Sequence, residues 1–299
     1  MSIAVIGAGK WGQALHFAIS QNFTCKIASR TPKEIKNFVS FEEALSCDYL
    51  VIALPAQVVR GWLERYARTD TFKNKKILVA AKGIEKGSGA FLNEIYKEFV
   101  SEENLSFLSG PSFATEVMQS LPTCVVINST NEKLSLEFAS FFPNFIKTYT
   151  CVDVIGAEVA GAYKNVLAIA SGICDGLKLG NNARASLIAR GLVEMQRFGL
   201  FFGAKESTFL GLSGAGDLFL TASSVLSRNY RVGLFLAEGK SLNEILEELG
   251  EVAEGVFTTE AIFELSCKHN IYLPIAKEVF LILNGKEPKE SLKDLLADK

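Results

Sequence analysis

Residues 2–12 read S-I-A-V-I-G-A-G-K-W-G, a short apolar strand that runs directly into a glycine-rich turn. The residues after the turn place their apolar side chains at helical spacing, which predicts an amphipathic helix. Strand, glycine turn and helix in this order form the fingerprint of a dinucleotide-binding unit. We expect a tight turn, a close approach of backbone to pyrophosphate at the helix start, and close packing of helix on strand at Gly7, Gly9 and Gly12 in turn.

Apolar runs of strand length then alternate with helical stretches as far as residue 150, and only helical patterns follow. We therefore expect an α/β Rossmann-like domain with a mostly parallel sheet at 1–150, and an all-α domain at 151–299. The predicted strands are 2–6, 25–29, 48–54, 76–81, 105–108, 124–128 and 144–149. The predicted helices of the second domain are 156–177, 182–201, 218–226, 242–249, 258–269 and 274–283.

Composition excludes several classes of protein. The 299 residues carry a net charge of −2, which argues against a basic nucleic-acid surface. No apolar run reaches the roughly 18 residues of a membrane helix, and the first residues lack the features of a signal peptide. The six cysteines are scattered without a C-x-x-C pair, so we expect neither a metal site nor disulfides, and a cytoplasmic location.

The stretch 156–172 reads G-A-E-V-A-G-A-Y-K-N-V-L-A-I-A-S-G. One helical face is apolar, whereas the residues around Lys164 are nearly all small, so another group can approach the amine closely. In one interpretation Lys164 extends to solvent, the usual fate of a lysine. In the other it is buried with a lowered pKa and acts as an acid or base. The chain has only two histidines, which favours lysine chemistry.

Three further patterns suggest binding residues. The second strand ends in neutral Ser29 followed by Arg30, where an NAD site usually carries a carboxylate; Arg30 can receive a 2′-phosphate, stack on adenine or lie in solvent. Lys82 follows the fourth strand, at the sheet edge where α/β proteins bind ligands. Residues 227–233, S-R-N-Y-R-V-G, offer guanidinium, hydroxyl and amide donors for a phosphate, or a solvated helix end.

The motifs G-A-G-K-W-G, K-G-I-E, S-G-P-S-F-A-x-E, A-Y-K-N-V-L-A-I-A-x-G, G-A-G-D-L and S-R-N-Y-x-x-G occur in this order. Together they resemble the bacterial NAD(P)-dependent glycerol-3-phosphate dehydrogenases, from residue 3 to about residue 265. The resemblance implies a cytoplasmic homodimer that reversibly reduces dihydroxyacetone phosphate to sn-glycerol 3-phosphate for phospholipid synthesis. It implies a small phosphorylated substrate and NADPH/NADP as the cofactor, with NAD possible.

The resemblance also implies roles for individual residues. Lys164 is the expected proton-transfer residue, and Asp217 holds either this lysine or a substrate hydroxyl. Lys10 stands where the family more often has serine. The substrate contacts fall on Lys82, Gly110, Ser112, Lys164, Asp217, Ser227, Arg228 and Asn229. The cofactor contacts fall on Gly7, Gly9, Lys10, Trp11, Gly12, Arg30, Lys82, Ala114, Arg228, Val252 and Glu254.

Two alternative functions stay open at this point. A related dehydrogenase acting on a β-hydroxy acid also uses a helix lysine, but usually places an asparagine four residues later, where this chain has Ala168. A non-catalytic dinucleotide-binding sensor would keep the glycine turn without needing Lys164, Asp217 and Arg228 together. We expect the protein to be an enzyme, with an active site between the two predicted domains and Lys82 facing Lys164.

Overall fold

The computed structural model describes residues 1–67, 70–250 and 253–297. It divides into two compact units, Met1–Lys82 with Phe91–Glu158, and Gly83–Ala90 with Val159–Lys299. The sequence places the change of pattern near residue 150, whereas the units divide inside a helix, after Glu158. No sequence pattern indicated that residues 83–90 join the second unit. The assignment of separate binding roles to two domains stays a prediction.

The first unit is built on a seven-stranded sheet with the order β2-β1-β3-β4-β5-β6-β7. Neighbouring strands are parallel except β5 and β6, which pair antiparallel. The mostly parallel α/β class expected from the sequence is confirmed. The strands are β1 (Ile3–Ile6), β2 (Cys25–Ala28), β3 (Tyr49–Ile52), β4 (Lys76–Val79), β5 (Leu105–Ser109), β6 (Thr123–Asn128) and β7 (Ile146–Cys151).

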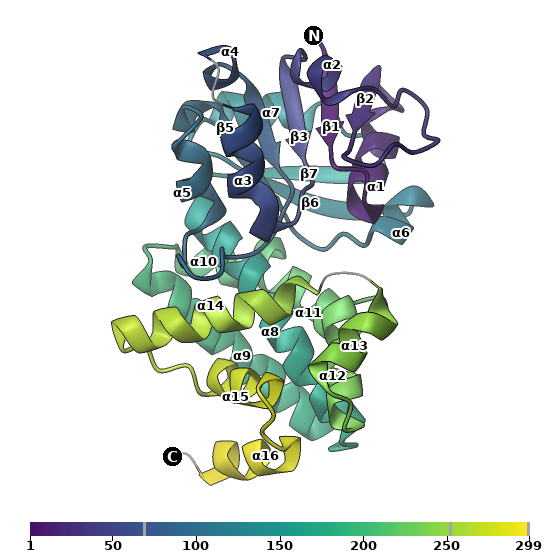
Figure 1. The fold of residues 1–299 in the computed structure, drawn as a ribbon. Helices are drawn as coiled ribbons and strands as arrows, with labels where there is room; N and C mark the ends of the chain where they lie inside the picture. Colours follow the sequence, from purple (N-terminus) through teal and green to yellow (C-terminus); the bar gives the residue numbers. More distant parts are fainter. Residues whose placement is uncertain (68–69, 251–252, 298–299) are drawn as a thin grey trace. The chain divides into compact units, whose positions relative to one another are not determined.

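Helices cover both faces of this sheet, as near-continuously apolar parallel strands require. Val5, Val51 and Leu78 pack into one core with helices α1, α6 and α7. The alternate strand residues face the other side, where α3 and α5 lie side by side (Figure 1). The helices of this unit are α1 (Lys10–Ile19), α2 (Phe41–Leu45), α3 (Ala56–Tyr66), α4 (Asp70–Lys73), α5 (Leu92–Lys97), the 3₁₀ turn η1 (Glu102–Asn104), α6 (Ala114–Met118) and α7 (Glu132–Ala139).

The second unit is helical, as expected. Its elements are α8 (Val154–Gly176), α9 (Asn181–Phe201), α10 (Glu206–Leu210), the π-helical turn η2 (Leu212–Gly216), α11 (Asp217–Ala222), α12 (Arg228–Ala237), α13 (Leu242–Leu249), α14 (Glu254–His269), α15 (Pro274–Leu283) and α16 (Pro288–Ala297). None of the helices described here is long and apolar enough to cross a membrane.

The helix α8 is buried from Gly156 to Cys174. A single carboxylate, that of Glu194 on α9, joins α8 to both α9 and α15. The Tyr163 hydroxyl donates to Glu194 Oε2 over 3.0 Å, and the backbone N–H of Ile275 at the start of α15 donates to Glu194 Oε1 over 2.8 Å. Burial raises the pKa of Glu194, and these donors oppose that rise. The position of α8 is therefore fixed by satisfied polar contacts as well as by apolar packing.

A second buried carboxyl, that of Glu158 on α8, is less well satisfied. Glu158 Oε1 accepts a hydrogen bond from the backbone N–H of Asn93 over 2.9 Å. Among the described residues, Glu158 Oε2 and the Tyr96 hydroxyl are both buried without a hydrogen-bond partner. Burial raises the pKa of Glu158 to about 8, against the opposing effect of the Asn93 N–H. Glu158 therefore holds its proton through much of the neutral range.

We predict that Glu158 makes the stability of the protein fall as pH rises. The folded-state pKa of about 8 exceeds the unfolded value of about 4.3, so the folded form binds the extra proton between these limits. The stabilisation is complete below the lower limit and is lost as pH rises through the upper one. From pH 5 to 8.5, chemical denaturation should show wild type losing on the order of 3 kcal/mol more than Glu158→Gln. Exposed Glu264→Gln is the control, and parallel curves for wild type and Glu158→Gln would contradict the prediction.

Candidate active site

The glycine turn after β1 has the geometry that a pyrophosphate-binding turn requires. Gly7 has φ +105°, and a Cβ there would lie 2.6 Å from the carbonyl oxygen of Ala53. A Cβ at Gly12 would lie 1.8 Å from the Gly7 carbonyl oxygen, so α1 packs directly on the turn. Gly9 is exposed at the start of α1, with open space where a side chain would be. The helix has no acidic residue in its first turn, so its N-terminus fits an anion.

Basic residues follow β2 beside this turn. The Gly7 N–H donates to the carbonyl of Ala28, the last residue of β2, and Arg30 follows two residues later on the exposed surface. Lys33 Nζ donates to the Ala8 carbonyl over 2.7 Å. The sequence did not single out Lys33, because its contact with the turn depends on the path of the loop. These cations suit a ligand with a further phosphate on its ribose.

The remaining predicted cofactor residues of the first unit lie on two helices of one sheet face. Trp11 Nε1 donates to the Ala80 carbonyl over 3.2 Å, which joins the glycine turn to the end of β4. Lys10 begins α1 and is exposed, and Ala114 begins α6, which packs against α1. These residues therefore share the carboxyl edge of the sheet with the glycine turn.

The predicted substrate residues of the first unit meet at one carbonyl group. Lys82 follows β4 and Gly110 follows the adjacent parallel strand β5. Lys82 Nζ donates to the Gly110 carbonyl over 3.4 Å, and Ser112 Oγ donates to the same oxygen over 3.1 Å. Gly110 has φ +98°, which only glycine adopts readily. The three residues form one cluster at the sheet edge that the sequence had indicated.

The main predicted residue of the second unit forms a buried ion pair. Lys164 Nζ lies 2.5 Å from Asp217 Oδ1 and 3.0 Å from the Thr221 hydroxyl. The three residues are 8%, 1% and 5% exposed, so Lys164 does not extend to solvent. The opposite charge stabilises the ammonium form against the cost of desolvation. The sequence left open whether Asp217 holds this lysine or a substrate hydroxyl, and in the structure Asp217 contacts the lysine.

The small residues on the face of α8 explain how the carboxylate reaches the amine. Ser171 Oγ donates to the Ala222 carbonyl at the end of α11 over 2.7 Å, so the two helices are in direct contact. The π-helical turn before α11 packs closely on α10, since a Cβ at Gly214 would lie 2.2 Å from the Phe209 carbonyl oxygen. Sequence reasoning missed Thr221, although its position one helical turn after Asp217 places both on one face.

The predicted phosphate residues surround the start of α12. The Ser227 hydroxyl caps this helix, accepting from the N–H of Tyr230 over 3.2 Å, and can still donate to a ligand. Arg228 is the exposed first residue of α12. Asn229 is buried, and its Oδ1 accepts from the N–H of Gly255, next to Glu254 at the start of α14. Val252 lies outside the described residues.

The two units thus hold separate parts of the predicted set. The glycine turn, Lys82, Gly110 and Ser112 belong to the first unit, and Lys164, Asp217 and 227–229 belong to the second, together with Thr221, which was not predicted. The expectation that Lys82 faces Lys164 stays a prediction, as do the individual binding roles. Within the ranges that the structure describes, no group of three or more histidine, cysteine or acidic side chains could hold a metal ion.

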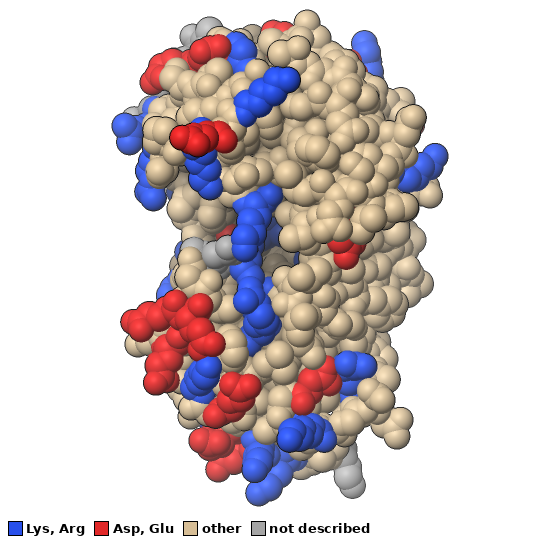
Figure 2. Space-filling model, turned by 90° about the vertical axis from the view of Figure 1, so that its right-hand side faces the viewer, with Lys and Arg blue, Asp and Glu red and all other residues tan. Residues whose placement is uncertain are grey.

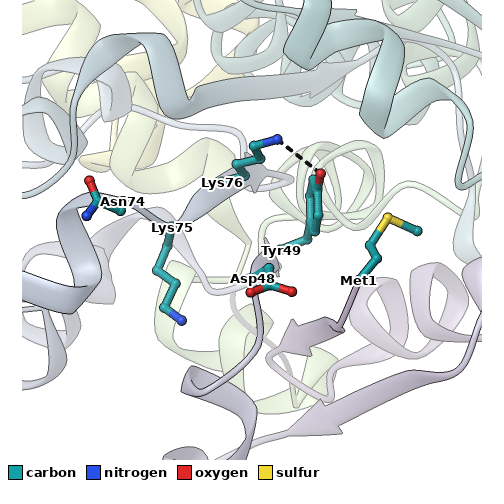
Figure 3. Close-up of a pocket in the computed structure, with 6 residues that line it drawn as sticks. All are labelled: Met1, Asp48, Tyr49, Asn74, Lys75 and Lys76. Carbon is teal, nitrogen blue, oxygen red and sulfur yellow. Dashed lines mark hydrogen bonds between the residues drawn. The ribbon is translucent and has the colours of Figure 1, made fainter.

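A cavity of about 480 Å³ lies elsewhere, at the amino ends of β3 and β4 (Figure 3). Several of its polar side chains form hydrogen bonds within the protein. Lys76 Nζ contacts the Tyr49 hydroxyl at 3.0 Å and Glu137 at 2.5 Å, while Lys75 Nζ donates to the Cys47 carbonyl at 2.8 Å. Acidic and basic side chains also lie close to one another in each unit on the face shown in Figure 2. Neither feature marks a site as well as the sheet edge and the Lys164 pair.

Comparison with known proteins shows the family of this chain. The family description "NAD-dependent glycerol-3-phosphate dehydrogenase N-terminus" matches residues 28–135, and its C-terminus counterpart matches residues 153–294. The glycerol-3-phosphate dehydrogenase (NAD(P)+) of Sulfurimonas denitrificans is 64% identical over 296 residues, covering 99% of each chain. That of Campylobacter jejuni is 61% identical over 298 residues, again covering 99% of each chain.

The chain belongs to the NAD-dependent glycerol-3-phosphate dehydrogenase family. The resemblance found in the motifs is thereby confirmed. The crystal structure of glycerol-3-phosphate dehydrogenase from Coxiella burnetii is 32% identical with a TM-score of 0.91, covering 99% of this chain and 98% of that one. The D-mandelate dehydrogenase structure is only 12% identical with a TM-score of 0.60, and shares the fold alone.

We predict that the Lys164–Asp217 pair is strongly coupled, because both charged side chains are buried. Asp217→Asn should destabilise the fold by about 3–5 kcal/mol, because it leaves a buried ammonium without its counter-charge. Lys164→Met with Asp217→Asn should cost less than the sum of the two single changes, by about 1–3 kcal/mol. Denaturant unfolding of all four proteins measures this coupling.

The control is a surface ion pair with the same distance between nitrogen and oxygen. Lys240 and Glu248 also lie 2.5 Å apart, but their side chains are 34% and 48% exposed. Their coupling should be much weaker than that of the Lys164 pair, because solvent screens exposed charges. Equal coupling in the two pairs would contradict the view that burial makes the Lys164 pair special.

Proposed function

We propose that this protein reduces dihydroxyacetone phosphate to sn-glycerol 3-phosphate with NADPH or NADH, reversibly, and that the product serves phospholipid synthesis. The observation that carries the proposal is the buried Lys164 ammonium, held by Asp217 and Thr221 in a chain of the glycerol-3-phosphate dehydrogenase family. The substrate is thus a small phosphorylated molecule. A non-catalytic sensor has no need of a desolvated, paired ammonium.

The reaction adds a hydride to the ketone carbon and a proton to the ketone oxygen. When bound, the reduced nicotinamide supplies the hydride. Lys164 supplies the proton, because an ammonium donates to the alkoxide that forms as the C–O double bond is lost. Asp217 and Thr221 hold Nζ in position and keep it charged until the oxygen becomes basic. In the reverse direction the neutral amine accepts the proton from the alcohol.

The phosphate of the substrate gives the protein a second point of attachment. Arg228, exposed at the start of α12, offers planar donors to a phosphate, and the hydroxyl of Ser227 and the amide of Asn229 stand beside it in sequence. Lys82 at the sheet edge adds a further cation. Fixing the phosphate orients the carbonyl, and such positioning contributes as much to rate as proton transfer.

The alternative substrate class, a β-hydroxy acid, is less well supported. The position four residues after the lysine is Ala168, which is buried and has no amide to offer. The nearby Asn165 uses its amide to donate to the Gly161 carbonyl within α8, over 3.2 Å. Ala168 therefore supplies no side-chain donor, and Asn165 stands one residue after the lysine rather than four.

The proposed assembly is a homodimer in the cytoplasm. The family resemblance supports the dimer, and six unpaired cysteines among the described residues support a reducing compartment. Sedimentation of the purified protein tests the first point, since a monomer at micromolar concentration would contradict it.

We predict that NADPH is used at least as well as NADH. Arg30 and Lys33 stand where a carboxylate would repel a 2′-phosphate, and no acidic residue occupies the end of β2. Arg30→Ala should lower kcat/KM for NADPH about 10-fold and change that for NADH much less. Arg65→Ala, on α3, is the control. A wild type that strongly prefers NADH, with no change in Arg30→Ala, would rule the argument out.

The proposed proton donor gives the central test. With dihydroxyacetone phosphate and NADPH, Lys164→Ala should lower kcat about 10²–10⁴-fold, the usual contribution of a general acid. NADPH binding, followed by fluorescence, should persist because the glycine turn is in the other unit. Lys178→Ala, on the exposed surface just after α8, should retain full turnover. Near-wild-type turnover of Lys164→Ala would show that the mechanism is wrong, and an inactive wild type would reject the substrate.

A further inference from the structure

Helices α8 and α12 touch through bare backbone at a pair of glycines. A Cβ at Gly172 would lie 2.0 Å from the Tyr230 carbonyl oxygen and 3.0 Å from the Cα of Gly233. A Cβ at Gly233 would lie 2.0 Å from the Ile169 carbonyl oxygen. The two distances to carbonyl oxygens are far below van der Waals contact, so neither glycine position accepts a side chain unless the helices separate.

The contact continues one turn further along both helices. A Cβ at Gly176 would lie 2.5 Å from the Cβ of Ala237 and 3.2 Å from the Leu234 carbonyl oxygen. Each helix thus carries small residues four apart, Gly172 and Gly176 on α8, and Gly233 and Ala237 on α12. Small residues at this spacing let two helix backbones approach closely.

The two helices carry different parts of the proposed site. Lys164 precedes Gly172 by two helical turns, about 12 Å along α8. Ser227, Arg228 and Asn229 stand at the start of α12, less than two turns before Gly233. The proposed proton donor and the proposed phosphate residues therefore stand on two helices whose backbones are in direct contact. Flexible side chains do not separate the two helices there, so a displacement of one helix also moves the other.

We propose that Gly172 and Gly233 are positioning residues that set the distance between the proton donor Lys164 and the phosphate group of the substrate. The inference rests on the proposed function. The ketone and the phosphate belong to one small molecule, so its two ends fix the spacing that the protein must match. A Cβ at either glycine forces the helices apart by roughly 1 Å, and a displacement of that size can cost about 100-fold in rate.

The test compares two substrates at saturating NADPH. Dihydroxyacetone phosphate uses both Lys164 and the phosphate residues, whereas dihydroxyacetone, which lacks the phosphate, uses Lys164 alone. Gly172→Ala and Gly233→Ala should each lower kcat/KM for the phosphorylated substrate about 100-fold, and that for dihydroxyacetone less than about threefold. Arg228→Ala should show the same selective loss.

A third variant keeps the test valid where these changes prevent folding. Gly176→Ala should give a smaller selective loss, because its closest contact is the side chain of Ala237. Adding Ala237→Gly restores the space and should return the ratio of the two kcat/KM values to within about threefold of wild type. Gly61→Ala, in α3 with nothing within 4 Å of the new Cβ, is the control for glycine replacement in a helix and should leave both substrates unaffected.

Two outcomes would overturn the inference. One is an equal loss for both substrates, which would mean that the glycines only support the fold or the lysine. The other is a set of folded variants, verified by circular dichroism, whose ratio matches wild type. Failure of the proposed function is distinguishable, because wild-type protein would then not reduce dihydroxyacetone phosphate at all.

Discussion

An ammonium group placed in the middle of a buried helix must have a counter-charge in contact with it, and much of the helical unit follows from this requirement. Desolvating Lys164 alone would cost several kcal/mol, which the Asp217 carboxylate at 2.5 Å offsets. The carboxylate reaches that distance only because α11 lies directly against α8, with Ser171 bonded to the Ala222 carbonyl. The small residues on this face of α8 are therefore a condition for the buried charge, and the charge is a condition for the proton transfer that we propose.

The same helix meets a second requirement two turns later. At Gly172 it lies against the backbone of α12, which carries the proposed phosphate residues, while Tyr163 on another face packs on Phe198. Glycine in a helix interior costs about 1 kcal/mol relative to alanine, so its presence needs a compensating contact. Here the contact is the close approach of two backbones. The alanines and glycines of α8 thus lie where neighbouring helices contact it most closely.

Local sequence patterns predicted most of the fold. The glycine turn, the apolar strands and the helix of 242–249 depend on neighbours in sequence, and the structure has each of them. The antiparallel β6 could not be predicted, because apolar runs do not encode direction. Helix α12 was missed since its first residues are polar, although Ser227 caps it. The role of Asp217 was open because it lies 53 residues from Lys164, and only packing shows which partner it meets.

The two units meet opposite electrostatic demands. In the first, the proposed anion-binding features are a helix N-terminus at exposed Gly9 and basic side chains at the surface, and water and salt weaken such attraction. That suits a cofactor that must leave after each turnover. In the second, the cation is 8% exposed and its partner 1%, so salt screens the pair little. A proton donor benefits from this permanence, because its position and charge must be ready before substrate arrives. High ionic strength should therefore weaken cofactor binding before it affects the proton-transfer step.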